Sequence, residues 1–450
     1  MSRIYIASAL KNKIFVSHSD AFALLFLSAT IVVITSFDYI WYGGIPLWLM
    51  MVILGCFVSM LSNKYRRAFR YFATHTFIWF ILPWILFVIG VATIDVIKGQ
   101  IELTLSKRIL LNLAVLWLAL MIGTWVLRVR PSNVIYILAG IGALQGLLCI
   151  AQFYGNDWAW RFPEFVIRKF GAHFDKSLLV DEDFFAIQRV RGTHIYVHKF
   201  NSMQGMILAF LLTVLILNIR YNNTLKLRTW ILVGGTLFTG IGMFLTFSRS
   251  TIFGNAIVFS ILIAINVRRF SVAVIIIIFI GFAYFAYEYL ELYNAGQFSR
   301  ITDFNESRIT NKSRIDQYVS AIHAFSKYPV IGGQSAGMTG GNIVHSVPLR
   351  LMVDYGAVGI LLYVIVIGGI LRFLLKCRNK CGGGIYVLSL AGLSSVFVAL
   401  LDAFTHSSGL LVRDVSQGGM IAAFMGLVMH FIRNTPSCTR RQVWIAKSSR

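Results

Sequence analysis

Charged residues are scarce in this chain, and acidic residues are the scarcest of them. Only 13% of the 450 residues are charged, with 18 Asp and Glu against 41 Lys and Arg. In contrast, 57% are hydrophobic and the mean hydropathy is +0.74. Soluble globular domains carry about 25% charged residues. The composition therefore indicates a polytopic membrane protein.

Cysteine is also rare, and its placement argues against a disulfide framework. Cys56 and Cys149 fall inside apolar stretches, while Cys377, Cys381 and Cys438 fall on the side of the membrane that we expect to be cytoplasmic. Cys377 and Cys381 have C-x3-C spacing. No second pair of ligands follows them, so the spacing does not favour a zinc site.

Two further features are missing. About 20 residues precede the first apolar stretch, and they show no cleavable signal peptide, so we expect the first helix to remain as the insertion signal. The chain also lacks the matching halves that mark many transporters. This absence weighs against a transporter of lipid-linked sugars or anions, which stays open as an alternative.

About twelve stretches are long enough to be membrane-spanning helices, because about 20 mostly apolar residues cross the hydrocarbon core. The sequence therefore predicts an all-α polytopic protein. The stretches lie near residues 20–37, 44–62, 75–95, 109–127, 133–153, 201–219, 229–247, 251–267, 271–288, 346–375, 383–401 and 415–432.

The distribution of charge predicts the orientation. A net charge of +23 would suggest nucleic acid in a soluble protein. Here most basic residues lie in short loops and tails on one side, as the positive-inside rule expects. Both termini should therefore be cytoplasmic, and we expect membrane lipids rather than nucleic acid as partners. The other basic residues lie in two long loops on the opposite face of the membrane.

These patterns divide the chain into six parts. We expect helices one to five in 1–153, the first long loop in 154–200, helices six to nine in 201–288, the second long loop in 289–345, helices ten to twelve in 346–433, and a basic cytoplasmic tail in 434–450.

The two long loops differ in pattern. The first is rich in aromatic and basic residues, which suits the level of the lipid headgroups. The second contains an amphipathic helix over Ser313–Pro329, with Ser313 and Asp316 as a capping box and Pro329 as its end. A glycine-rich stretch then leads to His345, so the second loop is partly helical and resembles a lid. The alternative is an ordered exterior domain without a catalytic role.

Arginines on the side opposite the cytoplasm are candidates for binding phosphate. Arg189 and Arg191 precede the sixth helix, Arg249 lies in a very tight turn between two apolar stretches, and Arg314 lies in the second loop. Guanidinium groups stay charged and pair bidentately with phosphate oxygens. A converging set would hold a pyrophosphate. For Arg189 and Arg191 the alternative is snorkelling at the interface.

His345 and its neighbours open the tenth helix. A histidine with a pKa near neutrality can accept a proton from a sugar hydroxyl. The alternative is a helix cap or an interface residue. Ser346 lies beside His345, and Arg350 with Asp354 has the i,i+4 spacing of an ion pair that would neutralise both charges.

Further along the same helix, Gly356 and Gly359 should allow close helix packing.

Other polar clusters are weaker candidates. Asp181, Glu182 and Asp183 have the D-x-D spacing of a metal site, but no second carboxylate cluster completes it, so we favour a solvated acidic loop and predict no metal. Asp402 and His406 form another polar turn on the periplasmic side.

Four segments resemble the O-antigen ligase family, within the O-antigen ligase and polymerase superfamily of bacterial envelopes. They are "HSVPLRLMVDYGAVG", "FSRS", "RVRGT" and "SRIDQYVSAIHAFSKYPVIGGQSAG", and together they span roughly residues 185–375. The family often continues the third segment as F-x-x-P-N. Here the run is "GTHIYVHKFN", with His194 in the aromatic position and no proline, so either Arg189 or Arg191 aligns with the family arginine.

The resemblance implies a metal-independent, inverting GT-C glycosyltransferase in the bacterial inner membrane, with no cofactor and with its active site on the periplasmic side. It would move a glycan from undecaprenyl pyrophosphate to the lipid A core in lipopolysaccharide biosynthesis. By the same likeness, His345 would activate or orient the acceptor hydroxyl, and Arg189, Arg191, Arg249 and Arg314 would bind the pyrophosphate.

The alternative is an O-antigen polymerase acting on the same glycan. Some polymerases carry an arginine, ten residues and then a glycine. Here Phe200 and Ser202 occupy those glycine positions, which favours the ligase.

Overall fold

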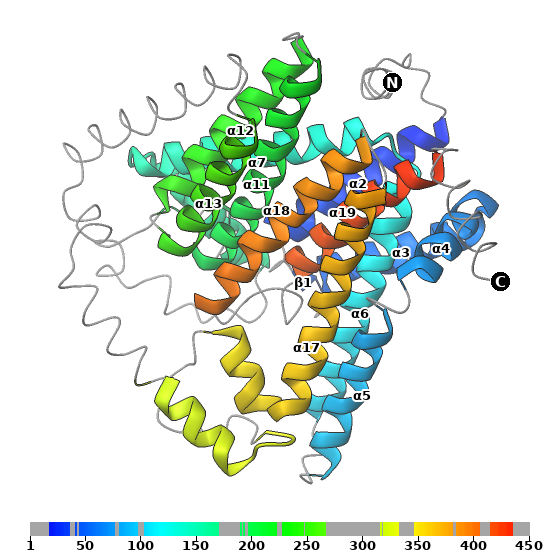
Figure 1. The fold of residues 1–450 in the computed structure, drawn as a ribbon, viewed down its shortest axis with the longest axis vertical. Helices are drawn as coiled ribbons and strands as arrows, with labels where there is room; N and C mark the ends of the chain where they lie inside the picture. The colour runs from blue at the N-terminus through cyan, green and yellow to red at the C-terminus, as the bar shows by residue number, and fades with distance from the viewer. Residues whose placement is uncertain are drawn as a thin grey trace.

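The computed structural model is almost entirely helical in the part of the chain that it describes (Figure 1). The only strands there form one hairpin, in which Trp41 pairs with Pro46 and Tyr42 with Ile45. The described residues are 18–36, 41–42, 45–76, 81–97, 103–170, 190, 192–193, 197–222, 227–246, 248–266, 316, 318–332, 346–380, 384–405 and 415–434.

The labelled elements follow one another along the chain as α2 (His18–Ser36), β1 (Trp41–Tyr42), β2 (Ile45–Pro46), α3 (Leu47–Leu61), α4 (Asn63–Thr76), α5 (Leu82–Ile97), α6 (Leu103–Val126), α7 (Pro131–Phe153), α8 (Asp157–Phe170), α11 (Val197–Asn222), α12 (Leu227–Leu245), α13 (Arg249–Asn266), α17 (Val347–Lys380), α18 (Gly384–Thr405) and α19 (Val415–Asn434).

The apolar stretches of the sequence coincide with helices, except for 271–288, which lies outside the described residues. Within the described part, four helices are long and apolar enough to cross a membrane alone, and a fifth span results if the bent pair α3 and α4 counts as one. The other apolar helices there are shorter. The structure agrees with a polytopic membrane protein, while the number twelve and the GT-C architecture stay predictions.

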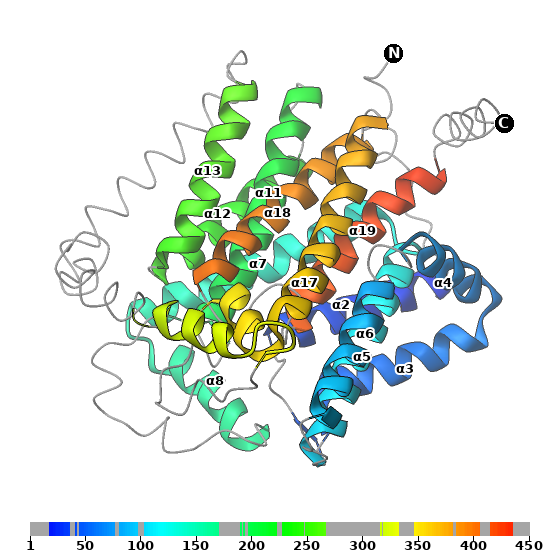
Figure 2. The same cartoon turned by 60° about the horizontal axis from the view of Figure 1, so that its bottom comes forward.

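Helix α11 lies at the centre of the bundle and contacts α7, α12, α13 and α18 (Figures 1 and 2). Its side chains are almost all buried, including several polar ones. Gln204 Nε2 donates a hydrogen bond to the carbonyl of Gly142 on α7 (3.2 Å), and Gln417 on α19 donates to Ser202 Oγ (2.6 Å). Because an unsatisfied polar group in hydrocarbon costs several kcal/mol, such bonds tie α11 to its neighbours.

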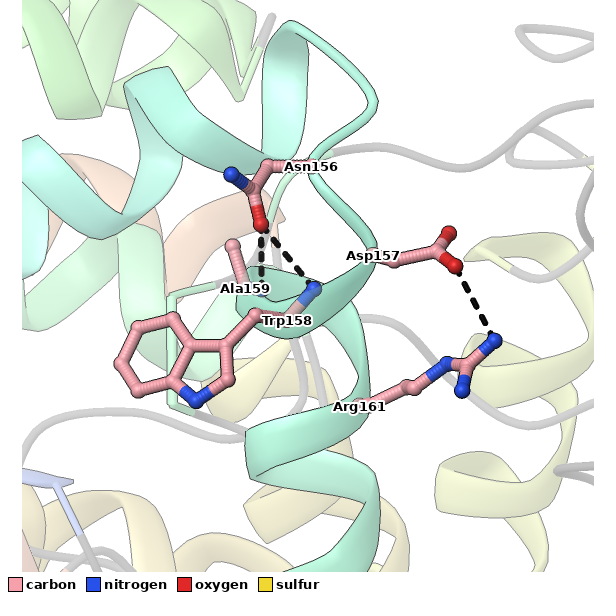
Figure 3. A network of polar contacts seen from close by, with 5 residues as sticks. All are labelled: Asn156, Asp157, Trp158, Ala159 and Arg161. Carbon is pink, nitrogen blue, oxygen red and sulfur yellow. Dashed lines mark hydrogen bonds and ion pairs between the residues drawn. The ribbon is translucent and has the colours of Figure 1, made fainter.

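The first long loop begins with a helix, α8, that the sequence analysis does not predict. Three residues separate α8 from α7. Asn156 Oδ1 caps its first turn by accepting hydrogen bonds from the backbone N–H groups of Trp158 (3.0 Å) and Ala159 (3.3 Å) (Figure 3). Asp157 and Arg161 form an exposed i,i+4 ion pair of 3.0 Å on the next turn. A cap of this kind starts a helix directly after a turn.

The two faces of α8 differ. Ala159 and Val166 are buried, whereas Trp158 and Phe165 on the other side are 66% and 56% exposed. Exposed aromatic rings on an amphipathic helix beside the end of a span suit the membrane interface. The placement fits the predicted headgroup-level surface in this loop.

In the second long loop, residues 318–327 are helical and Pro329 follows in a turn, as the sequence predicts. Ser313, the start of the expected capping box, lies outside the described residues. The buried face is made by alanine: Ala321 packs with Val353 of α17. Tyr318 and Ile322, which belong to the predicted apolar stripe, are exposed. Small side chains allow this helix to approach α17 closely.

Helices α7 and α12 pack against each other through small residues. A methyl group at Gly146 of α7 would overlap the backbone carbonyl of Phe238 on α12, and one at Gly142 would overlap Thr239 Oγ1. Close backbone contact of this kind is typical of helix pairs in membranes. The contact surface consists of Ala139, Gly142 and Gly146 against Gly235, Thr239 and Gly242.

A methyl group at Gly146 should therefore push α7 and α12 apart. We expect Gly146→Ala to destabilise the fold by about 1–3 kcal/mol, because the obstacle is backbone and cannot rotate away. The measurement is the thermal unfolding midpoint of the purified protein in detergent. Gly140→Ala is the matched control on the same helix, since a Cβ there meets nothing within 4 Å. Equal midpoints for the two variants would refute the packing argument.

Candidate functional site

Several predicted site residues lie outside the described residues: His345, Arg189, Arg191 and Arg314, and also Asp181, Glu182, Asp183 and His406. Arg249 is the first residue of α13, but its side chain is not described. Ser346, Arg350 and Asp354 are described in full. Described residues adjoin Arg189, Arg191, His345 and His406 in the chain, at Val190, Gly192, Ser346 and Thr405.

The turn that follows Arg191 is bound to α7 by two buried glutamine side chains. Gln152 Oε1 accepts a hydrogen bond from the N–H of Gly192 (3.0 Å), and Gln152 Nε2 donates to the carbonyl of the same residue (2.8 Å). Gln145 lies about two helical turns before Gln152 on α7, and its Oε1 accepts a hydrogen bond from the N–H of Thr193 (3.1 Å). The backbone of the turn thus takes its partners from α7.

Side chains complete this network. Gln145 Nε2 donates to Thr193 Oγ1 (2.7 Å) and to Ser36 Oγ at the end of α2 (2.7 Å). Thr193 Oγ1 in turn donates to the carbonyl of Ser36 (2.9 Å). Gly192 has φ +56°, and a Cβ there would overlap Gln145 Oε1. A glycine is needed at this position for both reasons.

The turn that carries Arg249 lies between α12 and α13 and is also held by buried polar contacts. Thr246 Oγ1 donates to Asn201 Oδ1 of α11 (2.6 Å). On the other side of Arg249, Ser250 Oγ donates to Asp402 Oδ1 of α18 (2.8 Å), and the Asp402 side chain is completely buried. A carboxylate at the first turn of α13 is favoured by the positive end of the helix dipole.

One small hydrophobic cluster joins the two arginine-bearing turns. Val190, directly before Arg191, is buried with Phe200 of α11, Cys149 of α7 and Leu245 at the end of α12. Leu245 is four residues before Arg249. The backbone segments beside Arg191 and Arg249 therefore share a core, and they lie at the same end of the helix bundle.

Helix α17 is broken at Gly356, which has φ +62° and ψ −155°. This conformation is open essentially to glycine alone. The segment 329–332 fills the break: the carbonyls of Pro329 and Val330 accept hydrogen bonds from the N–H groups of Ala357 (2.9 Å) and Val358 (3.2 Å). These N–H groups open the second half of the helix and have no partner within it.

The expectation that Gly356 allows close packing of helices is therefore corrected. A loop, rather than a helix, approaches this glycine, and the two halves of α17 run in different directions (Figure 1). In both views the first half begins near the C-terminal end of α18 (Figures 1 and 2), and α17 as a whole contacts α18. The break thus brings the start of α17, next to His345, towards the end of the bundle that holds the two arginine-bearing turns.

The predicted ion pair on α17 is present. Arg350 Nε lies 3.5 Å from Asp354 Oδ2, and Asp354 is buried. Ser346 is buried too, and its carbonyl accepts the N–H of Arg350 (2.9 Å) as the first helical bond. Pairing lowers the cost of placing both charges in an apolar surrounding. A supporting role at a catalytic site stays a prediction for these three residues.

Sequence reasoning missed the residues that hold the arginine turn, Gln145, Gln152 and Ser36. Their positions inside apolar helices were the available signal, because a glutamine in a membrane helix needs a partner. Among the described residues, no group of three or more His, Cys, Asp or Glu side chains is placed to hold a metal ion.

We expect Gly356→Ala to release the segment 329–332 from α17, because a Cβ would overlap the carbonyl of Val330 and the backbone conformation costs on the order of 1–3 kcal/mol in other residues. Tryptic cleavage after Lys327 in the folded protein should become faster. Gly368→Ala is the control on the same helix, since nothing lies within 4 Å of its Cβ position. Unchanged cleavage in the Gly356 variant would contradict this account of the break.

The comparison with known families now adds to this geometry. Residues 234–364 match the family model Wzy_C, described as O-antigen ligase. The matched segment begins within α12, contains α13, Arg249, Arg314 and His345, and ends within α17 after the break at Gly356. No curated protein matches the chain. The resemblance to the O-antigen ligase family is therefore confirmed for residues 234–364, which are similar to the model of that family.

Proposed function

We propose that the protein is an O-antigen ligase of the bacterial inner membrane. The family match indicates an enzyme of the ligase and polymerase group that acts on lipid-linked glycans. In the proposed reaction a glycan leaves undecaprenyl pyrophosphate and joins a sugar hydroxyl of the lipid A core. The observation that carries the proposal is that the matched segment includes both Arg249 and His345.

The proposed step is a single displacement with inversion. The acceptor oxygen forms a bond to the anomeric carbon of the glycan while the bond from that carbon to the pyrophosphate oxygen breaks. His345 takes the proton of the acceptor hydroxyl, and undecaprenyl pyrophosphate leaves with the bonding electrons. No metal or cofactor takes part in this proposal.

Arginine is suited to the donor side of this reaction. The departing pyrophosphate gains negative charge in the transition state, and fixed cations stabilise that charge without reorganising. Arg249, either Arg189 or Arg191, and Arg314 from the second loop are the proposed cations. The shared core of Val190 and Leu245 supports this assignment, because it joins the backbone beside Arg191 to the helix end before Arg249.

The proposed topology follows the charge distribution. Both termini lie in the cytoplasm, and the long loops, the arginine-bearing turns and His345 face the periplasm, with about twelve spans in between. The convergence of the ends of α7, α12 and α18 with the starts of α11 and α13 supports a single site on one side.

Deletion of the gene tests ligase against polymerase. We expect the deletion strain to make lipid A core without O antigen, while long polymer accumulates on undecaprenyl pyrophosphate. Electrophoresis of lipopolysaccharide and of the lipid-linked glycan measures both. Single repeat units on the core would instead identify a polymerase.

For His345, we expect substitution by alanine to lower the transfer rate by about 10²–10⁴-fold, the usual contribution of a general base. The variant is compared with wild type at equal expression, by complementation and by transfer in isolated membranes. His323→Ala is the matched control, since His323 is exposed on the helical segment 318–327 of the same loop. A wild-type transfer rate in the His345→Ala variant would show that His345 is not a catalytic residue.

For Arg249, alanine should lower the transfer rate by about 10²–10³-fold, as loss of one charge-stabilising group does in other enzymes. Arg249→Lys should recover only part of this, because an ammonium cannot pair bidentately with phosphate. Arg161→Ala, at an exposed ion pair of α8, is the control for loss of an arginine. Equal rates in the alanine and wild-type proteins would remove Arg249 from the site.

A further inference from the structure

We infer that Gln152 and Gln145 are positioning residues for the pyrophosphate site: they hold the turn at Gly192 and Thr193 and thereby set where Arg191 enters the site. The inference rests on the proposed function. It assigns a role to two side chains of α7 that are themselves too deeply buried to be exposed ligands.

The first argument is the direction of the hydrogen bonds. Gln145 and Gln152 are one heptad apart, on one face of α7, and both direct their amides to the same two-residue turn. A purely structural glutamine in a membrane bundle would be expected to pair with a neighbouring helix, as Gln204 does with the carbonyl of Gly142. Gln145 and Gln152 also reach neighbouring helices, at Ser36 of α2 and Ala159 of α8, but both direct hydrogen bonds to the connecting segment at Gly192 and Thr193 as well.

The second argument is that both neighbours of position 191 are fixed. Val190 is buried in the cluster with Cys149, Phe200 and Leu245, and Gly192 has both of its backbone groups bonded to Gln152. A residue between two anchored neighbours has a defined point of attachment. Only the rotamers of its own side chain then have to be ordered when an anion binds, which reduces the entropy cost of binding.

The third argument is that α7 carries this turn to a defined place relative to Arg249. The close contact between Gly146 of α7 and Phe238 of α12 fixes the two helices against each other. Gln145 and Gln152 lie on either side of that contact along α7, and α12 ends at the turn that carries Arg249. Because the glutamines attach the turn at Gly192 and Thr193 to α7, the packing of α7 against α12 also sets the position of this turn.

Gln152 also contacts α8. Its Nε2 donates to the carbonyl of Ala159 (3.0 Å), and its own carbonyl accepts the Nε1–H of Trp160 (2.9 Å). One residue thus joins the end of α7, the start of the amphipathic helix and the arginine turn.

Binding of undecaprenyl pyrophosphate to the purified full chain in detergent tests the inference, because this lipid is common to the ligase and polymerase reactions. We expect Gln152→Leu and Gln145→Leu each to raise the Kd of this lipid about tenfold, the effect of losing a hydrogen bond that orders a binding group. Gln204→Leu is the matched control, because it removes an equally buried amide that bonds to the same helix α7. Its Kd should stay within twofold of wild type.

A double-mutant cycle separates positioning from general destabilisation. In an Arg191→Ala background, Gln152→Leu should raise the Kd no further, because it acts through Arg191. Additive effects, or coupling to Arg189→Ala instead, would overturn the assignment to Arg191. Thermal midpoints of Gln152→Leu and Gln204→Leu should be lowered equally, and a Kd that follows the midpoint in both variants would also overturn the inference.

The two proposals fail in different ways. If gene deletion leaves lipopolysaccharide and lipid-linked glycan unchanged, the proposed function is wrong. If deletion and His345→Ala abolish transfer while Gln152→Leu binds undecaprenyl pyrophosphate as wild type does, the function stands and the positioning role is wrong.

Discussion

Contact between the backbones of α7 and α12 is the constraint on which the rest of the candidate site depends. Small residues at 139, 142 and 146 face small residues at 235, 239 and 242, so the helices interlock over about two turns. Neither helix can rotate or slide without overlap of backbone atoms. The C-terminal end of α12 leads into the turn that carries Arg249, and α7 is hydrogen-bonded to the turn that follows Arg191. Their relative position is therefore a consequence of helix packing, and the loops only connect them.

Buried polar side chains extend this rigid contact to the connecting segments. In hydrocarbon, a backbone N–H or carbonyl outside a helix has to find a partner within the protein. At Gly192 and Thr193 that partner is a glutamine side chain. In the turn before Arg249, the side-chain hydroxyl of Thr246 donates to Asn201 of α11. If a turn left its position, polar groups of the turn and of the helix side chains would lose their hydrogen-bond partners. For a site that holds a charged pyrophosphate, such fixed attachment points reduce what must be ordered on binding.

The sequence predicted the features that depend on neighbouring residues in the chain. Length and apolarity located the helices, and i,i+4 spacing predicted the Arg350–Asp354 pair. The features that depend on distant partners were missed. Gln152 is hydrogen-bonded to Gly192, 40 residues later in the chain, and no local sequence pattern predicts this contact. Gly356 lies in a continuous apolar run, and only the docked segment 329–332 explains why the helix breaks there.

Helix α8 was missed for a different reason. Its sequence mixes aromatic and basic residues around Pro163, a combination that favours a loop when helix packing is unknown. The cap at Asn156 and the bonds to Gln152 supply the stability that local propensity lacks. For His345, Arg189, Arg191 and Arg314, which lie outside the described residues, the sequence pattern predicts the role and the neighbouring elements supply the frame.

The break in α17 at Gly356 means that the candidate site is built from two separately attached parts of the fold. The arginine-bearing turns are attached to the interlocked helices α7 and α12, one by hydrogen bonds and the other by the chain itself. The first half of α17 is connected to the second half through Gly356 and packs with the helical segment 318–327. His345 directly precedes that first half. In the proposed reaction the donor lipid needs a fixed cationic site, while the acceptor sugar must enter and leave in each turnover. If the proposed roles hold, Arg191 and Arg249 would bind the donor from turns attached to packed helices, while His345 would meet the acceptor from the separate element that the break at Gly356 creates.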